Sequence, residues 1–231
     1  MWLLCVAAVI SAYLLGSINF ALIFANAFLK KDVRKLGSGN AGTTNVMRTA
    51  GFLPGALTFV CDVLKGFAAC YIGKMLFCYA LNTGGVKWAY PAYGVYLCGV
   101  ACMLGHVFPV FFQFKGGKGV ATSVGIFAVC CPKAIIIGLT VFALCVLITR
   151  IVSLSSLVAT VTVISLSIVF YDYSAPMLVP SLLSVSMGLT VFLKHKDNIK
   201  RLVKGEEKRI KIRRKSNERN YQRDRSCSAE S

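Results

Sequence analysis

Long apolar stretches separated by short polar segments dominate the hydropathy pattern of this chain. From Trp2 to Leu29 no residue is charged, and the first charges are the adjacent Lys30 and Lys31. A helix needs roughly 20 apolar residues to cross the ~30 Å hydrocarbon core of a bilayer. The pattern predicts an all-α, polytopic membrane bundle. Its further apolar stretches lie at about residues 52–80, 88–112, 120–131, 134–149, 151–171 and 176–193.

The number of spans depends on the sequence "CCPK". One helix over residues 120–149 would give six spans. A turn at Pro132 and Lys133 would give seven, with a fourth span that is short or partly re-entrant. Basic residues favour the second option, because cytoplasmic loops carry an excess of Lys and Arg. Segment 30–48 holds five of them, and the stretch from Lys194 to Ser231 holds 14 of the 26. Both lie on one side only with seven spans, so we predict the N-terminus outside and the C-terminus in the cytoplasm.

Composition supports a membrane protein and argues against several other classes. Hydrophobic residues make up 56% of the 231 positions, charged residues 15%, and the mean hydropathy is +0.68. The net charge of +17 does not point to nucleic acid, because it is concentrated in the tail, which we expect to lie against anionic lipid headgroups. The start of the chain carries no positive charge, so we expect the first segment to stay as an anchor rather than to be cleaved.

Cysteines and carboxylates give no sign of a cofactor. Nine of the ten cysteines are scattered through apolar segments, and only Cys227 is in the tail. Without a C-x-x-C pair or zinc spacing, we expect them to be small buried side chains. No carboxylates cluster in sequence, so we expect no metal and no other cofactor.

The sequence "GSGNAGTTN" fits two nucleotide-binding patterns in part. Gly37, Gly39 and Gly42 match G-x-G-x-x-G, and Asp62 follows at about the right distance, but an apolar span precedes them instead of a strand. In the P-loop pattern, Thr43 stands where the phosphate-binding lysine belongs. We therefore expect no nucleotide.

Phosphate chemistry nevertheless fits the first polar segment, "GSGNAGTTNVMR". Its glycines, Gly39 and Gly42 among them, allow the backbone N–H groups to curl around an anion. Arg48 adds a permanent charge whose planar fork matches phosphate oxygens. The alternative is a flexible turn between two spans, which would not require so many small polar residues. The neutral donors are Ser38, Asn40, Thr43, Thr44 and Asn45.

Two further polar segments carry cations. "GHVFPVFFQFKGGKGVATS" sets Lys115 and Lys118 among Gly116, Gly117 and Gly119. The lysines alone would suit a topology anchor, but the glycines favour an anion site.

"KHKDNIKRLVKGEEKRI" follows the last span and places His195, Asn198 and Arg201 on one face of a predicted helix. Taken alone, it would be read as a solvated basic helix. With seven spans, all three polar segments lie on one membrane face, where they can form a single site.

Three ionisable residues fall inside or at the ends of apolar stretches. Asp62 and Lys65 are three residues apart, and we expect them to form a buried structural pair, because lone charges in a membrane are costly. His106 ends the third span, and the favoured interpretation is a packing residue bonded to a backbone carbonyl rather than a catalytic one.

These three motifs closely resemble those of the bacterial acyl-phosphate-dependent glycerol-3-phosphate acyltransferase family. "GSGNAGTTNVMR", "GHVFPVFFQFKGGKGVAT" and "HKDNIKRLVKGEE" occur in the family's order and at similar spacing, and the likeness runs from Leu14 to about Ile210. The resemblance implies a seven-helix membrane enzyme with a cytoplasmic active site. The implied reaction transfers the fatty acyl group of an acyl phosphate to the 1-hydroxyl of sn-glycerol 3-phosphate, giving lysophosphatidic acid and phosphate.

Matching the motifs residue by residue implies roles for particular positions. The resemblance assigns catalysis to Ser38, Lys118, His195 and Asn198. Substrate binding is assigned to a larger set: Gly39, Asn40, Gly42, Thr43, Thr44, Asn45, Arg48, Lys115, Gly116, Gly117, Ser156 and Arg201. The chain departs from the family at Ala41, where proline is frequent, and at Thr43, where alanine is usual. It also has a longer tail after about Lys211.

The resemblance also implies an organisation and partners. We expect a membrane-embedded catalytic domain over residues 1–193 and a basic cytoplasmic tail over 194–231, whose first part, 195–207, completes the active site. The expected location is the bacterial plasma (inner) membrane. Expected partners are acyl phosphate, glycerol 3-phosphate, membrane lipids and the soluble enzyme that forms the acyl phosphate. The alternative is a membrane transporter for phosphate or a phosphorylated metabolite, but it would need polar groups near the midplane and often shows repeats, which are not found.

Overall fold

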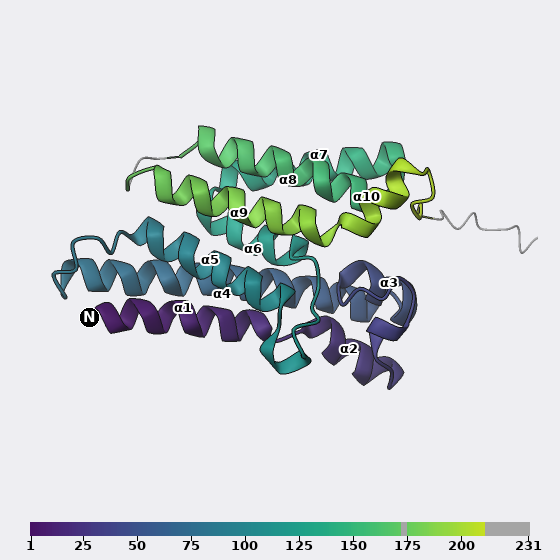
Figure 1. The fold of residues 1–231 in the computed structure, drawn as a ribbon, viewed down its shortest axis with the longest axis horizontal. Coiled ribbons are helices and arrows are strands. Elements are labelled where there is room, and N and C mark those ends of the chain that lie inside the picture. The colour runs from purple at the N-terminus through teal and green to yellow at the C-terminus, as the bar shows by residue number, and fades with distance from the viewer. Residues whose placement is uncertain (172–174, 211–231) are drawn as a thin grey trace, which may run out of the picture.

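The computed structural model describes residues 1–171 and 175–210, which form helices and connecting segments without strands. A bundle of long helices is capped at one end by short ones (Figure 1). In chain order the helices are α1 (Trp2–Ser17), α2 (Phe20–Leu29), the 3₁₀ turn η1 (Val33–Lys35), α3 (Thr43–Ala50), α4 (Phe52–Asn82), α5 (Pro91–Val107), η2 (Val110–Phe112), α6 (Val120–Cys130), α7 (Pro132–Thr149), α8 (Val152–Val169), α9 (Leu178–Lys194) and α10 (Lys196–Val203).

The helix breaks at the "CCPK" sequence, as predicted. α6 ends at Cys130 and α7 begins with Pro132 at its first position, where the missing N–H of proline costs nothing. Among the described residues, five segments are long and apolar enough to cross a membrane, and a sixth is reached if α9 and α10, bent by 60°, are taken together. α6 has only 11 residues, about 16 Å of helix, so it matches the short fourth segment that was expected. The seven-span count and the side of each terminus stay predictions.

The first apolar stretch is divided, which its sequence did not indicate. α1 stops at Ser17, and α2 restarts at Phe20 after Asn19, whose side-chain Oδ1 accepts a hydrogen bond from the Leu22 N–H at 3.1 Å. The change of direction carries α2 out of the row of long helices, to a place below α3 in the view of Figure 1. It thereby sets the course of the chain into the first polar segment.

Small residues allow the long helices to pack closely. A Cβ added to Gly16 of α1 would lie 2.1 Å from the Cys102 carbonyl oxygen, and one added to Gly105 of α5 would lie 2.2 Å from that of Tyr13. Such close contact between backbones is the usual basis of helix association in membranes, where lipid offers no hydrophobic drive. The nine described cysteines are free thiols, and five of them are buried, in line with the expectation of packing residues.

The three polar segments gather at one end of the bundle. In Figure 1 α2, α3, the connection after α5 and α10 lie toward the right, and the N-terminus lies at the opposite end. The predicted gathering of these segments at one end is therefore confirmed, and their position on the cytoplasmic face of a membrane stays a prediction. Residues 211–231, including Cys227, lie outside the described residues.

Candidate active site

The first glycine-rich segment is held in shape by the side chain of Asn45. Its Oδ1 accepts the Ser38 N–H at 2.8 Å, while its Nδ2 donates to the carbonyls of Val33 at 3.1 Å and Leu36 at 2.9 Å. Gly37 has φ of +62°, and a Cβ there would lie 2.2 Å from Asn45 Oδ1, so glycine is required. This bonding uses the Asn45 amide inside the loop, and it leaves Ser38 exposed at the surface.

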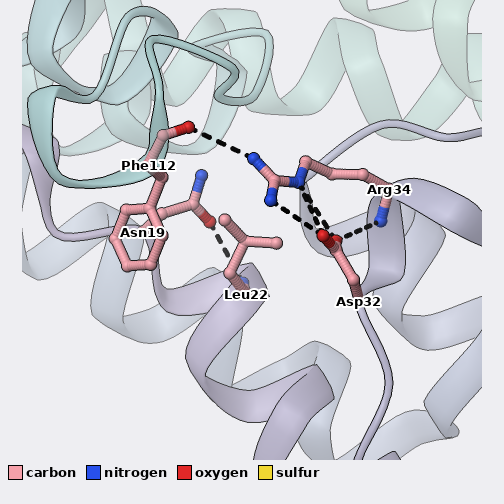
Figure 2. Close-up of polar contacts among 5 residues, drawn as sticks. All are labelled: Asn19, Leu22, Asp32, Arg34 and Phe112. Carbon is pink, nitrogen blue, oxygen red and sulfur yellow. Dashed lines mark hydrogen bonds and ion pairs between the residues drawn. The ribbon is translucent and has the colours of Figure 1, made fainter.

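An arginine clamp joins this segment to the connection after α5 (Figure 2). Arg34 bonds Asp32 through Nε and Nη2, at 2.8 to 3.1 Å, and donates from Nη1 to the Phe112 carbonyl at 3.2 Å. The hydrogen bonds from Arg34 hold the pKa of Asp32 below its usual value. The clamp fixes two segments that lie 78 residues apart in sequence. The sequence analysis did not identify it.

The second glycine-rich segment folds back on the end of α5. Gly116 donates its N–H to the Val107 carbonyl at 3.2 Å, and Gly117 donates to that of His106 at 3.1 Å. A Cβ on Gly117 would come 2.7 Å from the Ala41 carbonyl, so only glycine allows the two glycine-rich segments to cross. Lys118 is the next residue along the chain after this crossing.

Lys118 and Lys115 have different environments. The Lys118 Nζ donates to Asn198 Oδ1 on α10, whereas Lys115 is exposed. Burial lowers the pKa of Lys118 to about 8, partly offset by the attraction of Glu207. The Lys118 ammonium is therefore mostly charged at pH 7 but poorly hydrated, which strengthens its interaction with an incoming anion.

Glu207 organises the third polar segment. Its Oε1 accepts from Asn198 Nδ2 at 2.5 Å and from Ser153 Oγ of α8 at 2.8 Å, and its Oε2 accepts from Arg201 Nε at 2.6 Å. Burial acts to raise the pKa of Glu207, but these hydrogen bonds lower it overall. The carboxylate holds Asn198 in place for Lys118. Sequence analysis missed Glu207 and Ser153, although a glutamate within so basic a segment was an available signal.

His195 lies between α9 and α10, just after the last residue of the spanning helix, and is 2% exposed. Its Nδ1 lies 2.8 Å from the Val191 carbonyl oxygen, so Nδ1 carries the proton and Nε2 is left as an acceptor. Burial and the nearby Lys118 lower the pKa of His195 to about 4. At pH 7 the imidazole is neutral and weakly basic.

A cationic cleft opens between residues 32–39, residues 113–116 and the end of α9, and Ser38, Arg48, Lys118, His195 and Asn198 do not line it. It has a volume of about 600 Å³, and Gly39 and Gly116 contribute to its wall. Lys194, at the end of α9, lies with its Nζ 4.2 Å from the centre of the Phe108 ring. Asp32 is already paired with Arg34, so the cleft keeps an excess of positive charge. Its basic residues are Arg34, Lys35, Lys115 and Lys194.

An apolar cavity of about 60 Å³ lies deeper, between α6, α7, α8 and α9. Ser156 lines it, and its hydroxyl donates to the Val152 carbonyl at 2.9 Å within α8. Phe127, Val163 and Met187 form part of the same wall. Its apolar lining suits hydrocarbon, and its volume would hold only part of a fatty acyl chain.

The other expected site residues lie around this centre without joining it directly. Gly42 caps α3, Thr43 begins that helix, and Asn40, just before the cap, is half-buried. Thr44 and Arg48 are exposed on α3, and in the described part of the chain no hydrogen bond or ion pair connects Arg48 to Lys118 or α10. The structure therefore brings together Lys118, Asn198 and Arg201, the last through Glu207. The role of each expected residue stays a prediction.

Similarity to known proteins agrees with this site. The family model described as "Glycerol-3-phosphate acyltransferase" matches residues 6–205. Glycerol-3-phosphate acyltransferase 2 of Bacillus anthracis is 38% identical over 201 residues, covering 87% of this chain and 96% of that protein. Glycerol-3-phosphate acyltransferase of Francisella tularensis subsp. novicida is 42% identical over 206 residues, covering 87% and 90%.

Two solved structures of an integral membrane glycerol 3-phosphate acyltransferase, PlsY (YgiH), share the fold. Its glycerol 3-phosphate form superposes with a TM-score of 0.74 at 36% identity, covering 90% of this chain and 96% of that one. The lysophosphatidic acid form gives a TM-score of 0.70 at 36% identity, covering 90% and 95%.

Proposed function

Because this multi-pass membrane protein belongs to the glycerol-3-phosphate acyltransferase family, we propose that it acylates glycerol 3-phosphate with acyl phosphate as donor. The acyl group passes to the 1-hydroxyl of sn-glycerol 3-phosphate, and the products are lysophosphatidic acid and phosphate. The observation that carries the proposal is the hydrogen bond from Lys118 to Asn198, which joins the second glycine-rich segment to the basic helix α10. Lys118 lies in sequence between Gly116, which lines the cationic cleft, and Val120, which lines the apolar cavity.

Two anions must approach each other in this reaction, and their repulsion is a main obstacle. Lys118 lies beside the crossing of the glycine-rich segments, and Lys35, Lys115 and Lys194 line the adjoining cleft. Fixed positive charge in a partly desolvated site offsets that repulsion without reorganising during the reaction. The hydroxyl of exposed Ser38 is available to one phosphate group, with Arg48 close in sequence, whereas the N–H groups of Ser38, Gly39 and Gly42 already donate within the loop.

An acyl phosphate is a mixed anhydride with a good leaving group, so positioning supplies most of the catalysis. The alcohol oxygen attacks the acyl carbon, the bond to the phosphate oxygen breaks, and the alcohol proton passes to a substrate phosphate oxygen. His195, neutral and weakly basic, accepts a hydrogen bond at Nε2 and orients the acceptor. Asn198 holds Lys118 at the reacting end.

The transporter alternative is not favoured, because the polar segments cluster at one end of the bundle (Figure 1). We place the enzyme in the bacterial inner membrane with its active site facing the cytoplasm, where a soluble enzyme would deliver acyl phosphate. Residues 1–193 form the membrane-embedded catalytic domain in this proposal. Segment 195–207 completes the site, an assignment supported by the bonds from Glu207 to Ser153 and Asn198.

The test uses purified protein in detergent with palmitoyl phosphate and labelled glycerol 3-phosphate. We expect labelled lysophosphatidic acid and one phosphate released per product. Parallel reactions contain palmitoyl-CoA or palmitoyl acyl carrier protein in place of palmitoyl phosphate. Product formed only with one of these donors would overturn the donor assignment, and no product with any donor would overturn the activity.

A further inference from the structure

A buried cluster of ionisable side chains lies beneath the glycine-rich segments and has no part in the proposed chemistry. Asp62 and Lys65 of α4 are 1% and 3% exposed, and His106 of α5 is 3% exposed. Lys65 Nζ lies 2.9 Å from Asp62 Oδ1, which confirms the expected pair, and His106 Nδ1 lies 3.4 Å from the same oxygen. The His106 ring thus faces a carboxylate rather than the expected backbone carbonyl. Ionisable groups at such a depth are expensive and usually functional.

Lys65 also stabilises the break between α1 and α2. Its Nζ donates to the carbonyls of Gly16 at 3.0 Å and Ile18 at 2.8 Å. A helix end leaves carbonyl groups without intrahelical partners, and in a membrane few other donors are available. The ammonium therefore fixes the point at which the chain changes direction.

The direction of α2 determines the position of the first glycine-rich segment. The segment packs on α2 through a small apolar cluster, and it continues directly into α3. A change at the break would therefore displace Ser38. The cluster consists of Ala21, Leu22 and Ala25 of α2 with Val33, Ala41 and Val46.

His106 supports the second glycine-rich segment from below. Its backbone carbonyl accepts the Gly117 N–H at 3.1 Å, and its ring Nε2 would lie 2.3 Å from a Cβ at Gly117. The same Cβ would meet the Ala41 carbonyl, so Gly117 is held between the imidazole and the first segment. Movement of the ring would shift Lys118, the next residue.

We propose that Asp62, Lys65 and His106 are positioning residues that hold the two glycine-rich segments in register for catalysis. Lys65 fixes the first segment through the α1–α2 break, His106 supports the second, and Asp62 joins the two through one carboxylate oxygen. A buried ion pair contributes little net stability and often can be replaced by apolar residues. We therefore assign this pair a role in positioning the two segments rather than in stabilising the fold. This inference rests on the proposed acyl transfer.

The test compares two neutral variants with a control on the same helix. The double variant Asp62→Asn/Lys65→Met removes both charges together, which avoids leaving one buried charge unpaired. His106→Phe keeps an aromatic ring but loses the contact with Asp62. The control is Thr58→Val, which removes a buried hydrogen bond to the Pro54 carbonyl at 2.7 Å, one turn before Asp62. Purified variants are compared for thermal midpoint, for kcat and KM, and for amide exchange of segments 37–45 and 113–119 without substrate.

We expect KM for glycerol 3-phosphate to rise at least about tenfold in the double variant and in His106→Phe, with faster exchange in both segments. Thr58→Val should leave KM and exchange within about twofold of the parent, whatever its thermal midpoint. Unchanged KM for glycerol 3-phosphate and unchanged amide exchange in both neutral variants would overturn the inference. If the double variant does not fold, the result for His106→Phe decides. Parent protein without acyltransferase activity would instead reject the proposed function, and the exchange measurement would still test the positioning role.

Discussion

The two glycine-rich segments look alike in sequence but are stabilised in different ways. Segment 37–45 is held from within, because the single side chain of Asn45 bonds Ser38, Val33 and Leu36. Segment 113–119 is held from outside, by the carbonyl groups at the end of α5 and by Asn198 of α10. The first can take its shape from local sequence alone. The second acquires its shape only when distant helices have packed.

Because of this difference, substitutions in the first segment should affect the folding of that loop, and substitutions in the second should affect the assembly of the site. A change inside the first segment should disrupt that loop as a unit. A change in the second segment should depend on which neighbour the altered side chain contacts. Each of the following experiments tests this distinction, beginning with the largest expected effect.

Asn45→Ala should have the largest effect on activity. It removes the three side-chain hydrogen bonds that hold the first segment, although the Val33 and Leu36 carbonyls each keep one backbone N–H donor. A cost of about 2–4 kcal/mol in loop stability corresponds to a roughly 30- to 900-fold loss of kcat/KM. The control is Thr49→Ala on the same helix, which removes only a hydrogen bond to the Asn45 carbonyl at 2.8 Å, with a change of a few-fold at most. Equal kcat/KM in both variants would show that the loop does not depend on Asn45.

Lys118→Ala should cost much more activity than Lys115→Ala. Lys118 is half-buried next to the crossing of the two segments, and it bonds Asn198. The loss of a charge-assisted interaction of ~1.5–3 kcal/mol should lower kcat/KM by roughly 10- to 150-fold. Lys115 is exposed, so its removal should cost only a few-fold. Small and equal losses of kcat/KM in both variants would indicate that these lysines only set the membrane topology.

The charge of Lys118 should also set a basic limb in the pH profile. Because its pKa is about 8, the ammonium is lost above that pH, and kcat/KM should fall about tenfold per unit there. Glycerol 3-phosphate is already a dianion at these pH values, so substrate ionisation does not interfere. The lysine of the unfolded chain keeps its proton to higher pH, so this group makes the fold more stable, not less, as pH rises through 8. Lys118→Arg should abolish the limb, and a limb that survives would assign it to another group.

Substitution of His195 should have the smallest effect and should separate two roles. Glutamine can replace the hydrogen bonds of the imidazole but cannot take up the proton. If His195 orients the acceptor, His195→Ala should lose roughly 2- to 12-fold in kcat/KM, and His195→Gln should retain much more activity. The low pKa of this imidazole, about 4, favours that outcome. Glutamine as inactive as alanine, with unchanged glycerol 3-phosphate binding, would make His195 the general base.

Much of the architecture could be predicted from sequence, because apolar stretches report directly on burial in lipid. The break at Cys131, the free cysteines and the Asp62–Lys65 pair follow from proline, spacing and the cost of a lone buried charge. Asn19, by contrast, looks like one polar residue in a long apolar stretch. The break is also held by Lys65, which bonds the Ile18 carbonyl from 47 residues away in sequence, so no local pattern marks it.

By itself, the sequence determined which segments enter the membrane, which polar segments remain outside the apolar stretches, and the phosphate chemistry of their glycines and cations. These properties are local, because they depend on the hydropathy, conformational freedom and charge of consecutive residues. Only the tertiary structure decided that Lys118 meets Asn198, that Glu207 joins Ser153 of α8 to α10, and that Arg34 clamps Phe112. Those contacts join residues from distant parts of the chain, and their energies arise only after helix packing has excluded water. These contacts therefore cannot be predicted from the pattern of neighbouring residues in the sequence.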